Sequence, residues 1–235
     1  MPTIRMEQVT KTYPGRAYAT TAVRDIDLVV EQGEFLFLVG SRGAGKSTLL
    51  DLIAGTVKPD RGRIYLDDKE VTAMTKTQSD KIRNCIGRVG QNSFLKRNET
   101  VYNNLSSERR VMGFFKKRVL DMTLADKALA IVGMPGSGNQ FPRDLTTPEC
   151  RRILVAKAIQ TSPAILLLDD FTARLDEDTT GDMLYLLNEL NRKGTTIFMA
   201  TNSSYVVNSQ RRRVVTLADG MIVGDVQKGR YGYIG

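Results

Sequence analysis

The chain has 235 residues, of which 41% are hydrophobic and 26% are charged, proportions that are ordinary for a soluble globular protein. A chain of this length can form one large domain with a substantial core, and its apolar runs fall short of the roughly 18 residues that a membrane-spanning helix needs. The formal net charge of +8 is compatible with nucleic acid or an anionic membrane surface as a partner. The basic residues are spread along the sequence, however, which favours an ordinary solvated surface.

The first residues and the cysteines bear on the cellular compartment. The start of the chain, MPTIRM, lacks the apolar core of a signal peptide, so we expect a protein of the cytosol. Cys85 and Cys150 lie far apart and form no metal-ligand spacing, which favours reduced thiols. The sequence contains no histidine.

Two strands are predicted at residues 3–9 and 22–30, ahead of a short apolar strand at residues 35–39. The segment between the first two strands begins near Tyr13. An aromatic side chain in this place can stack on a nucleobase, but a tyrosine at a strand end has an equally good structural explanation. Both interpretations of Tyr13 remain open.

The strongest motif follows the third strand. Residues 40–48 read GSRGAGKST and match the phosphate-binding pattern G-x-x-x-x-G-K-[ST]. A helix predicted at residues 47–54 completes the order of strand, glycine loop and helix N-terminus, where backbone N–H groups and the helix dipole favour an anion. Lys46 is expected to reach the β- and γ-phosphates, and Ser47 to hold Mg²⁺. The sequence therefore predicts a nucleoside triphosphate site, with binding residues Gly40, Ser41, Gly43, Ala44, Gly45, Lys46, Ser47 and Thr48.

The next segment is predicted to contain short strands and a polar loop. A strand at residues 63–67 and the apolar run 82–89 lead to Gln91, and the loop covers residues 92–100. A glutamine just past a strand end can sense a γ-phosphate or Mg²⁺, although a lone glutamine usually has no such role.

The pattern then becomes helical and basic over residues 101–132. We interpret this stretch as a helical subdomain whose amphipathic face is core, with a membrane-surface role as the weaker alternative. Residues 134–138 are interpreted as a linker. Thr146 and Glu149 form a capping box at the start of a helix that runs to Ile159.

The last third of the chain contains a strand that ends in two carboxylates, Asp169 and Asp170. In such a strand, known as Walker B, the first carboxylate supports Mg²⁺ and the next activates water. Because strands alternate with helices here, we expect an α/β core with a mostly parallel sheet. The predicted elements are strands at 164–168 and 195–200, a helix at 180–190 and a strand pair within 214–226.

With these elements in order, the chain resembles the ATP-binding subunits of ABC transporters over essentially its whole length. Within that family it is most similar to the FtsE branch of cell-division ATPases, and the ATPase subunits of lipoprotein-release and MacB-type exporters are close relatives. The likeness is carried by residues 13–15 (YPG), 33–40 (GEFLFLVG), 100–104 (TVYNN), 194–201 (GTTIFMAT) and 229–232 (GRYG).

The resemblance implies a P-loop ATPase fold over residues 1–235, with a mostly parallel sheet, an antiparallel β subdomain and a helical subdomain at roughly 92–162. It implies ATP and Mg²⁺ as cofactors, with Ser47, Gln91 and Asp169 at the metal and Asp176 as the D-loop aspartate. Two such subunits, either two copies of this chain or this chain with a second ABC subunit, would sandwich two ATP molecules. The dimer would lie at the cytoplasmic face of the plasma or inner membrane beneath an FtsX-like integral membrane protein, without nucleic acid.

Three positions depart from the family pattern. The signature segment that one subunit presents to the other's ATP, Leu-Ser-Gly-Gly-Glu, reads LTTPE here. Thr146 keeps a hydroxyl, but Thr147 adds bulk and Pro148 removes an N–H group. The catalytic glutamate is replaced by the shorter Asp170, and the switch histidine by Asn202, which can donate a hydrogen bond but cannot titrate. A displacement of a catalytic group by about an ångström can lower the reaction rate roughly a hundredfold. Because the carboxylate of Asp170 is set back by one methylene, we expect impaired ATP hydrolysis.

The leading hypothesis is an FtsE-like ATP-binding subunit with slow turnover. Its catalytic residues would be Asp170, Asn202 and Gln91, and its signature residues, acting on a partner's site, would be Thr146, Thr147 and Glu149. The alternatives are a nucleotide-gated pseudo-ATPase scaffold, the ATPase subunit of a lipoprotein-release or MacB-type exporter and, at a distance, an ABC protein that acts on nucleic acid.

Overall fold

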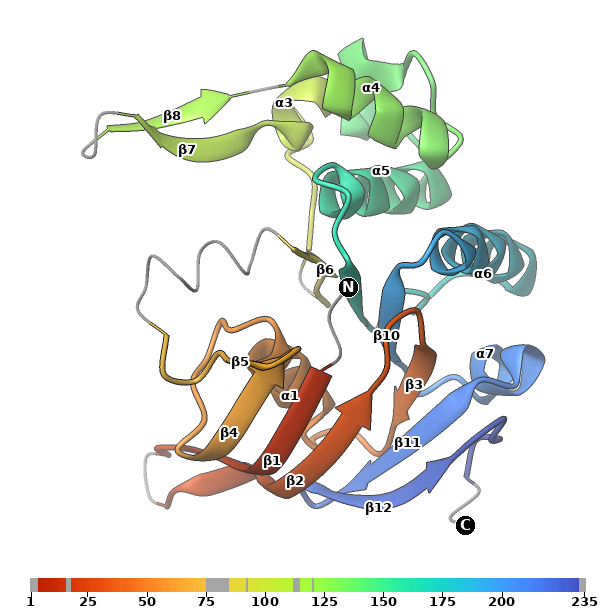
Figure 1. The fold of residues 1–235 in the computed structure, drawn as a ribbon. Helices are drawn as coiled ribbons and strands as arrows, with labels where there is room; N and C mark the ends of the chain where they lie inside the picture. The colour runs from red at the N-terminus through yellow and green to blue at the C-terminus, as the bar shows by residue number, and fades with distance from the viewer. Residues whose placement is uncertain are drawn as a thin grey trace. The chain divides into compact units, whose positions relative to one another are not determined.

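The computed structural model of the chain describes residues 4–15, 18–74, 85–91, 93–111, 115–119 and 121–232. These residues form two compact units (Figure 1). Unit 1 consists of Met1–Gln91 and Ala164–Gly235, and unit 2 of Asn92–Pro163.

Unit 1 contains an antiparallel sheet built mainly from the first strands of the chain. Its strand order is β2-β1-β4-β5. The strands predicted at 3–9 and 22–30 are confirmed, although Thr3 lies outside the described residues and both strands run further than predicted. The four strands are β1 (Ile4–Tyr13), β2 (Thr20–Val30), β4 (Arg61–Leu66) and β5 (Lys69–Glu70).

The second sheet of unit 1 has six strands in the order β12-β11-β3-β10-β9-β6. Every neighbouring pair is parallel except β11 and β12, which are antiparallel and form the strand pair predicted within 214–226. All residues of β3, β9 and β10 are buried, because a parallel sheet is covered on both faces, and this explains their continuous apolar runs. The strands are β3 (Phe35–Val39), β6 (Ile86–Val89), β9 (Ile165–Asp169), β10 (Thr196–Ala200), β11 (Arg213–Ala218) and β12 (Met221–Val226).

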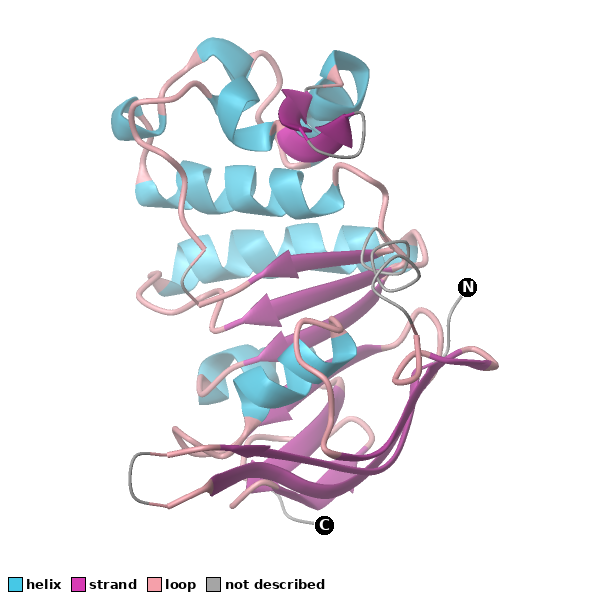
Figure 2. Cartoon of the chain, turned by 90° about the vertical axis from the view of Figure 1, so that its left-hand side faces the viewer, coloured by secondary structure: helices cyan, strands magenta, loops and turns pink. Residues whose placement is uncertain are grey.

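The core of unit 1 lies between its two sheets, around helix α1 (Lys46–Ile53). This helix contacts β9 and β10 of one sheet and β2 of the other, and buries four aliphatic side chains. Helix α6 (Glu177–Arg192) covers the opposite face of the parallel sheet and packs on β10 (Figure 2). Helix α7 (Ser204–Gln210) is joined to α6 by a hydrogen bond from Asn188 to Gln210 of 2.7 Å.

Unit 2 is a small helical body formed by α3 (Val101–Leu105), α4 (Met122–Ile131) and α5 (Thr147–Ile159). Two short 3-10 turns, η1 (Ser137–Asn139) and η2 (Pro142–Asp144), connect α4 to α5. The ring of Tyr102 lies so close to Gly138 that a Cβ atom there would be 2.0 Å from the ring. Residues 134–138, predicted as a linker, are therefore a packed turn, and that prediction was wrong.

A second correction concerns the segment that follows α3. Strands β7 (Ser107–Val111) and β8 (Phe115–Val119) pair as an antiparallel two-stranded sheet, where the sequence predicted the continuation of a helix. Residues 112–114 lie outside the described residues. The sequence offers a reason, because Gly113 disfavours a helix interior and the basic run around it lacks a sustained apolar stripe. In the described part of the chain, none of the helices has both the length and the hydrophobicity needed to cross a bilayer.

Candidate functional site

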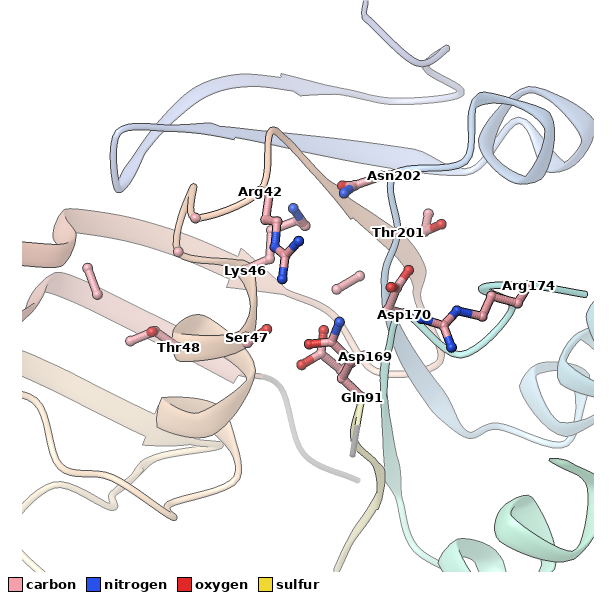
Figure 3. Close-up of a pocket in the computed structure, with 14 residues that line it drawn as sticks. Arg42, Lys46, Ser47, Thr48, Gln91, Asp169, Asp170, Arg174, Thr201 and Asn202 are labelled. Carbon is pink, nitrogen blue, oxygen red and sulfur yellow. The ribbon is translucent and has the colours of Figure 1, made fainter. Parts of the chain in front are cut away.

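A cavity of about 520 Å³ lies at the carboxyl edge of the parallel sheet, within unit 1 (Figure 3). The carboxyl ends of parallel strands meet at one edge, so the segments that follow β3, β6, β9 and β10 converge there. Nine of the predicted site residues line this cavity: Gly43, Gly45, Lys46, Ser47, Thr48, Gln91, Asp169, Asp170 and Asn202.

The shape of the loop between β3 and α1 depends on two glycines. Gly40 has a φ of +147°, and a Cβ atom there would lie 2.2 Å from the carbonyl oxygen of Leu217. Gly45 has a φ of +101°, and its Cβ would lie 2.3 Å from the carbonyl oxygen of Ala22. Both values lie in the region that favours glycine, and neither position leaves space for a side chain. The loop conformation is therefore available only to a sequence with glycine at both positions.

The N-terminus of α1 opens into the cavity without a competing cap. Gly45 occupies the N-cap position, so no side chain accepts from the first N–H groups, and the first turn contains no acidic residue. Free N–H groups and the positive end of the helix dipole together form a site for an anion.

Lys46 provides the cation of this loop. Its Nζ donates hydrogen bonds to the carbonyl oxygens of Gly40 at 2.7 Å and Ser41 at 2.9 Å. Burial lowers the pKa of this ammonium group, while the neighbouring carboxylates Asp169 and Asp170 act in the opposite direction. Phosphate oxygens are stronger acceptors than carbonyl oxygens, so the ammonium group is positioned to transfer its hydrogen bonds to a phosphate.

Oxygen donors face this loop from the other side of the cavity. Asp169 is the last residue of β9 and only 7% exposed, and Asp170 follows it with a φ of +52°. The backbone N–H of Asp170 donates to the carbonyl oxygen of Ala200 at 3.0 Å, which fixes the start of this turn against β10. The side chains of Ser47, Gln91 and Asp169 present hydroxyl, amide and carboxylate oxygens to one cavity, a donor set that suits a hard divalent cation.

Asn202 reaches the cavity from the end of β10. The preceding Thr201 is buried, donates its N–H to Leu38 at 3.1 Å and accepts at its hydroxyl from the N–H of Ser203 at 3.1 Å. These contacts hold the chain on both sides of Asn202, which is exposed.

Sequence reasoning missed two cations of the site. Arg42 lies within the glycine loop and Arg174 follows the Walker B strand, and both line the cavity. The sequence could have indicated both arginines, because they lie inside or close to recognised motifs. Ala22, Ala200 and Thr201 also line the cavity and carried no signal of their own.

Other predicted residues lie outside the cavity lining. Gly40, Ser41 and Ala44 belong to the glycine loop but do not line the cavity. Tyr13 lies at the end of β1, 36% exposed, with the Nζ of Lys11 at 5.6 Å from its ring centroid. Its contact with a base stays a prediction.

The signature residues belong to unit 2 and form the predicted capping box of α5, which is confirmed. The hydroxyl of Thr146 donates to the Glu149 carboxylate at 2.7 Å, and its backbone N–H donates at 2.8 Å. The hydroxyl and then the backbone N–H of Thr146 hold the pKa of Glu149 below its usual value. The single hydroxyl proton of Thr146 is therefore engaged within its own helix terminus. In unit 1, Asp176 caps α6 by accepting from the N–H of Thr179 at 2.8 Å.

The chain matches known proteins over almost its full length. The family described as ABC transporter matches residues 23–173. The cell division ATP-binding protein FtsE of Mycobacterium tuberculosis is 36% identical over 229 residues, which are 97% of this chain and 98% of that protein. FtsE of Streptococcus pneumoniae D39 is 35% identical over 237 residues, 99% of each chain. The methionine import ATP-binding protein MetN 2 of Rhodococcus jostii is 36% identical over 223 residues, 94% of this chain but 65% of that protein.

Solved structures agree with this assignment. The dimeric structure of MJ0796, a bacterial ABC transporter cassette, has a TM-score of 0.82 at 27% identity and covers 97% of this chain and 100% of that one. A post-hydrolysis dimer of the same cassette bound to ADP and Pi has a TM-score of 0.81 at 26% identity, with the same coverage. The chain therefore belongs to the ABC transporter family of ATP-binding proteins, as a relative of the cell division ATP-binding proteins FtsE.

Proposed function

We propose that this chain is the ATP-binding subunit of an FtsE/FtsX-like membrane complex, which couples ATP binding and slow hydrolysis to cell division or cell-wall remodelling. The observation that carries the proposal is the end-to-end similarity to FtsE proteins together with the glycine-loop cavity. The chain would act as an ATP-sandwich dimer at the cytoplasmic face of the membrane.

In this proposal the cavity binds Mg-ATP through its triphosphate. The loop N–H groups and Lys46 would contact the phosphates, and Ser47, Gln91 and Asp169 would hold Mg²⁺. When bound, Mg²⁺ would neutralise charge on the phosphate oxygens. The donor set fits this ion, because all three side chains offer hard oxygen ligands in one cavity.

Hydrolysis requires a water molecule to attack the γ-phosphorus while the bond to the bridging oxygen of ADP breaks. Asp170 would accept the proton of that water, but its carboxylate is one methylene shorter than the glutamate of the family. Asn202 can donate a hydrogen bond to the terminal phosphate but cannot carry a charge. We therefore expect ATP to bind well and to be hydrolysed slowly.

These departures also favour a second candidate, a nucleotide-gated scaffold that dimerises on ATP without useful turnover. The specific observation is that the Thr146 hydroxyl, which the family would direct to a partner's γ-phosphate, is engaged with Glu149. Steady-state ATPase activity, alone and with the membrane partner, separates the two candidates.

The binding test compares ATP affinity of the wild type, Lys46→Ala and Lys127→Ala, an exposed lysine of α4 as a matched control. Loss of the Lys46 ammonium should weaken ATP binding by about tenfold or more, while the control should match the wild type. Equal ATP affinity in all three proteins would contradict the proposed site.

The membrane role is tested by isolating the tagged chain with its membrane partner and identifying that partner. An integral membrane protein with about four spans and a large extracytoplasmic loop would support the FtsX-like assignment. An exporter or a methionine permease in its place would redirect the proposal to transport.

A further inference from the structure

Two arginine side chains line the cavity, those of Arg42 and Arg174. Among the described residues, Arg42 and Arg174 form no hydrogen bond or ion pair. The contrast with Lys46 is direct, since its ammonium group already donates to two carbonyl oxygens. A guanidinium presents donors in a planar fork that matches phosphate oxygens, so an unpaired one on a concave surface suits an anionic ligand.

Arg174 is held toward this cavity by an unusual turn after β9. The N–H of Ala173 donates to the carbonyl oxygen of Asp170 at 3.1 Å, and the N–H of Leu175 donates to that of Thr172 at 3.2 Å. Asp170 and Arg174 bracket the turn with φ values of +52° and +65°, a region that non-glycine residues rarely adopt. Both of these left-handed residues line the cavity, and such conformations are concentrated at functional sites.

The two arginines approach from different sides. Figure 3 shows Arg42 beside Lys46 on the glycine loop, and Arg174 on the side of Asp170, Thr201 and Asn202. A triphosphate that enters the loop by its β-phosphate points its terminal phosphate toward the second side, where the water-activating carboxylate lies. Arg174 therefore lies on the side of the cavity where the group that ATP has and ADP lacks would be bound, opposite Lys46 and Arg42.

We infer that Arg174 binds the terminal phosphate of ATP and gives the chain its preference for ATP over ADP; this rests on the proposed nucleotide site. The guanidinium carries a positive charge. It supplies at the terminal phosphate a positive charge that Asn202 cannot provide. Arg174 is thus a specificity-determining residue for the nucleotide, and its role does not require hydrolysis.

The experiment measures the Kd of Mg-ATP and of Mg-ADP for the full chain by calorimetry, in the wild type, Arg174→Gln, Arg174→Lys and Arg230→Gln. Arg230 is exposed and lies outside the cavity lining, so Arg230→Gln controls for the loss of one unit of global charge. Arg174→Gln should weaken ATP binding by about tenfold or more and change ADP binding by less than about twofold. Arg174→Lys keeps the charge but not the fork, and should fall between the wild type and Arg174→Gln.

The outcomes separate this inference from the proposed function. If the wild type binds neither nucleotide, the nucleotide site itself is wrong. If ATP binding is normal in Arg174→Gln, or if ATP and ADP weaken equally, the assignment of Arg174 to the terminal phosphate is overturned while the site stands. Melting curves identify a variant that has lost its fold. If Arg174→Gln unfolds, Arg174→Lys serves as the test. A ratio of its Mg-ATP Kd to its Mg-ADP Kd equal to that of the wild type would refute bidentate recognition of the terminal phosphate by Arg174.

Discussion

The shorter carboxylate at position 170 can be tested by restoring the missing methylene. Asp170→Glu should move the carboxylate oxygens toward the attacking water by about an ångström, which corresponds to roughly a hundredfold in rate. Adding Asn202→His returns a side chain that can contact the γ-phosphate. A well-positioned general base typically accelerates a reaction by about 10²–10⁴-fold. The turnover of the double variant should therefore exceed that of the wild type by a factor in this range.

The structure also predicts what this change costs. Asp170 has a φ of +52°, and aspartate tolerates the left-handed region better than glutamate does. Asp170→Glu should therefore lower the free energy of unfolding by about 1 kcal/mol, because a longer side chain lacks the local hydrogen bonds that offset this conformation. For a chain of this size that is a fall in melting temperature of about 2–4 °C. A stable domain that loses about 1 kcal/mol remains almost entirely folded, so this loss should not hide a hundredfold gain in rate.

The assay is phosphate release at saturating ATP, with ATP affinity and melting temperature measured on the same samples. Asp170→Asn is the matched control, because it keeps the size of the side chain and removes the base. Turnover unchanged within twofold in Asp170→Glu, at unchanged ATP affinity, would refute the view that carboxylate length limits the rate. A wild type that already hydrolyses several ATP molecules per second, an ordinary enzymatic rate, would refute it as well.

Three further predictions concern other parts of the chain. Phe94 is 77% exposed, whereas Leu95 is only 8% exposed. Phe94→Asp should therefore abolish co-purification with the membrane partner and leave the melting temperature unchanged. Leu95→Asp should instead lower the melting temperature. The N–H group that Asp176 caps lowers the pKa of this carboxylate, so its stabilisation is lost as the pH falls through that lowered value. Denaturant unfolding of Asp176→Asn should therefore show a shallower acid dependence. Thr147→Gly with Pro148→Gly should increase ATP-dependent dimerisation in analytical centrifugation, and an unchanged dimer fraction would contradict this.

Much of unit 1 could be predicted because its signals are local. The glycine loop has fixed spacing, and only glycine is compatible with the backbone at Gly40 and Gly45. Strands β3, β9 and β10 are buried on both faces, so each appears as an unbroken apolar run. The cavity follows from these features, because parallel strands bring the segments after them to one edge of the sheet.

The predictions that failed lie in unit 2, where packing overrides weak local patterns. Gly138 looked like part of a linker, but its missing side chain leaves room for the Tyr102 ring. Phe94 and Leu95 are adjacent apolar residues of the predicted polar loop at 92–100, yet Phe94 is exposed and Leu95 is buried. Adjacent apolar residues in a loop give no periodicity, so the sequence could not show which of the two faces the core.

The charged lining of the cavity was predicted only in part. Asp169 and Lys46 occupy motif positions and were identified from the sequence, whereas Arg42 and Arg174 occupy positions where a motif allows any residue. Their direction depends on turn geometry, above all on the left-handed backbone of Arg174. A cation next to a motif is visible in the sequence, but whether it faces the ligand is decided by φ and ψ.

The signature segment shows how one substitution can be locally favourable and functionally unfavourable. Pro148 in the first turn of α5 does not disturb the helix, because the first N–H groups of a helix lack intrahelical partners. The same missing N–H would be a donor to phosphate in the family arrangement. The Thr146 hydroxyl and the Glu149 carboxylate likewise satisfy each other within the capping box. If ATP bound to a partner subunit contacts this segment, it would have to break the bond from Thr146 to Glu149 before it gains the hydroxyl as a donor. The double variant Asp170→Glu with Asn202→His should for this reason dimerise no more than the wild type does. These two positions line the cavity, whereas the signature segment belongs to unit 2.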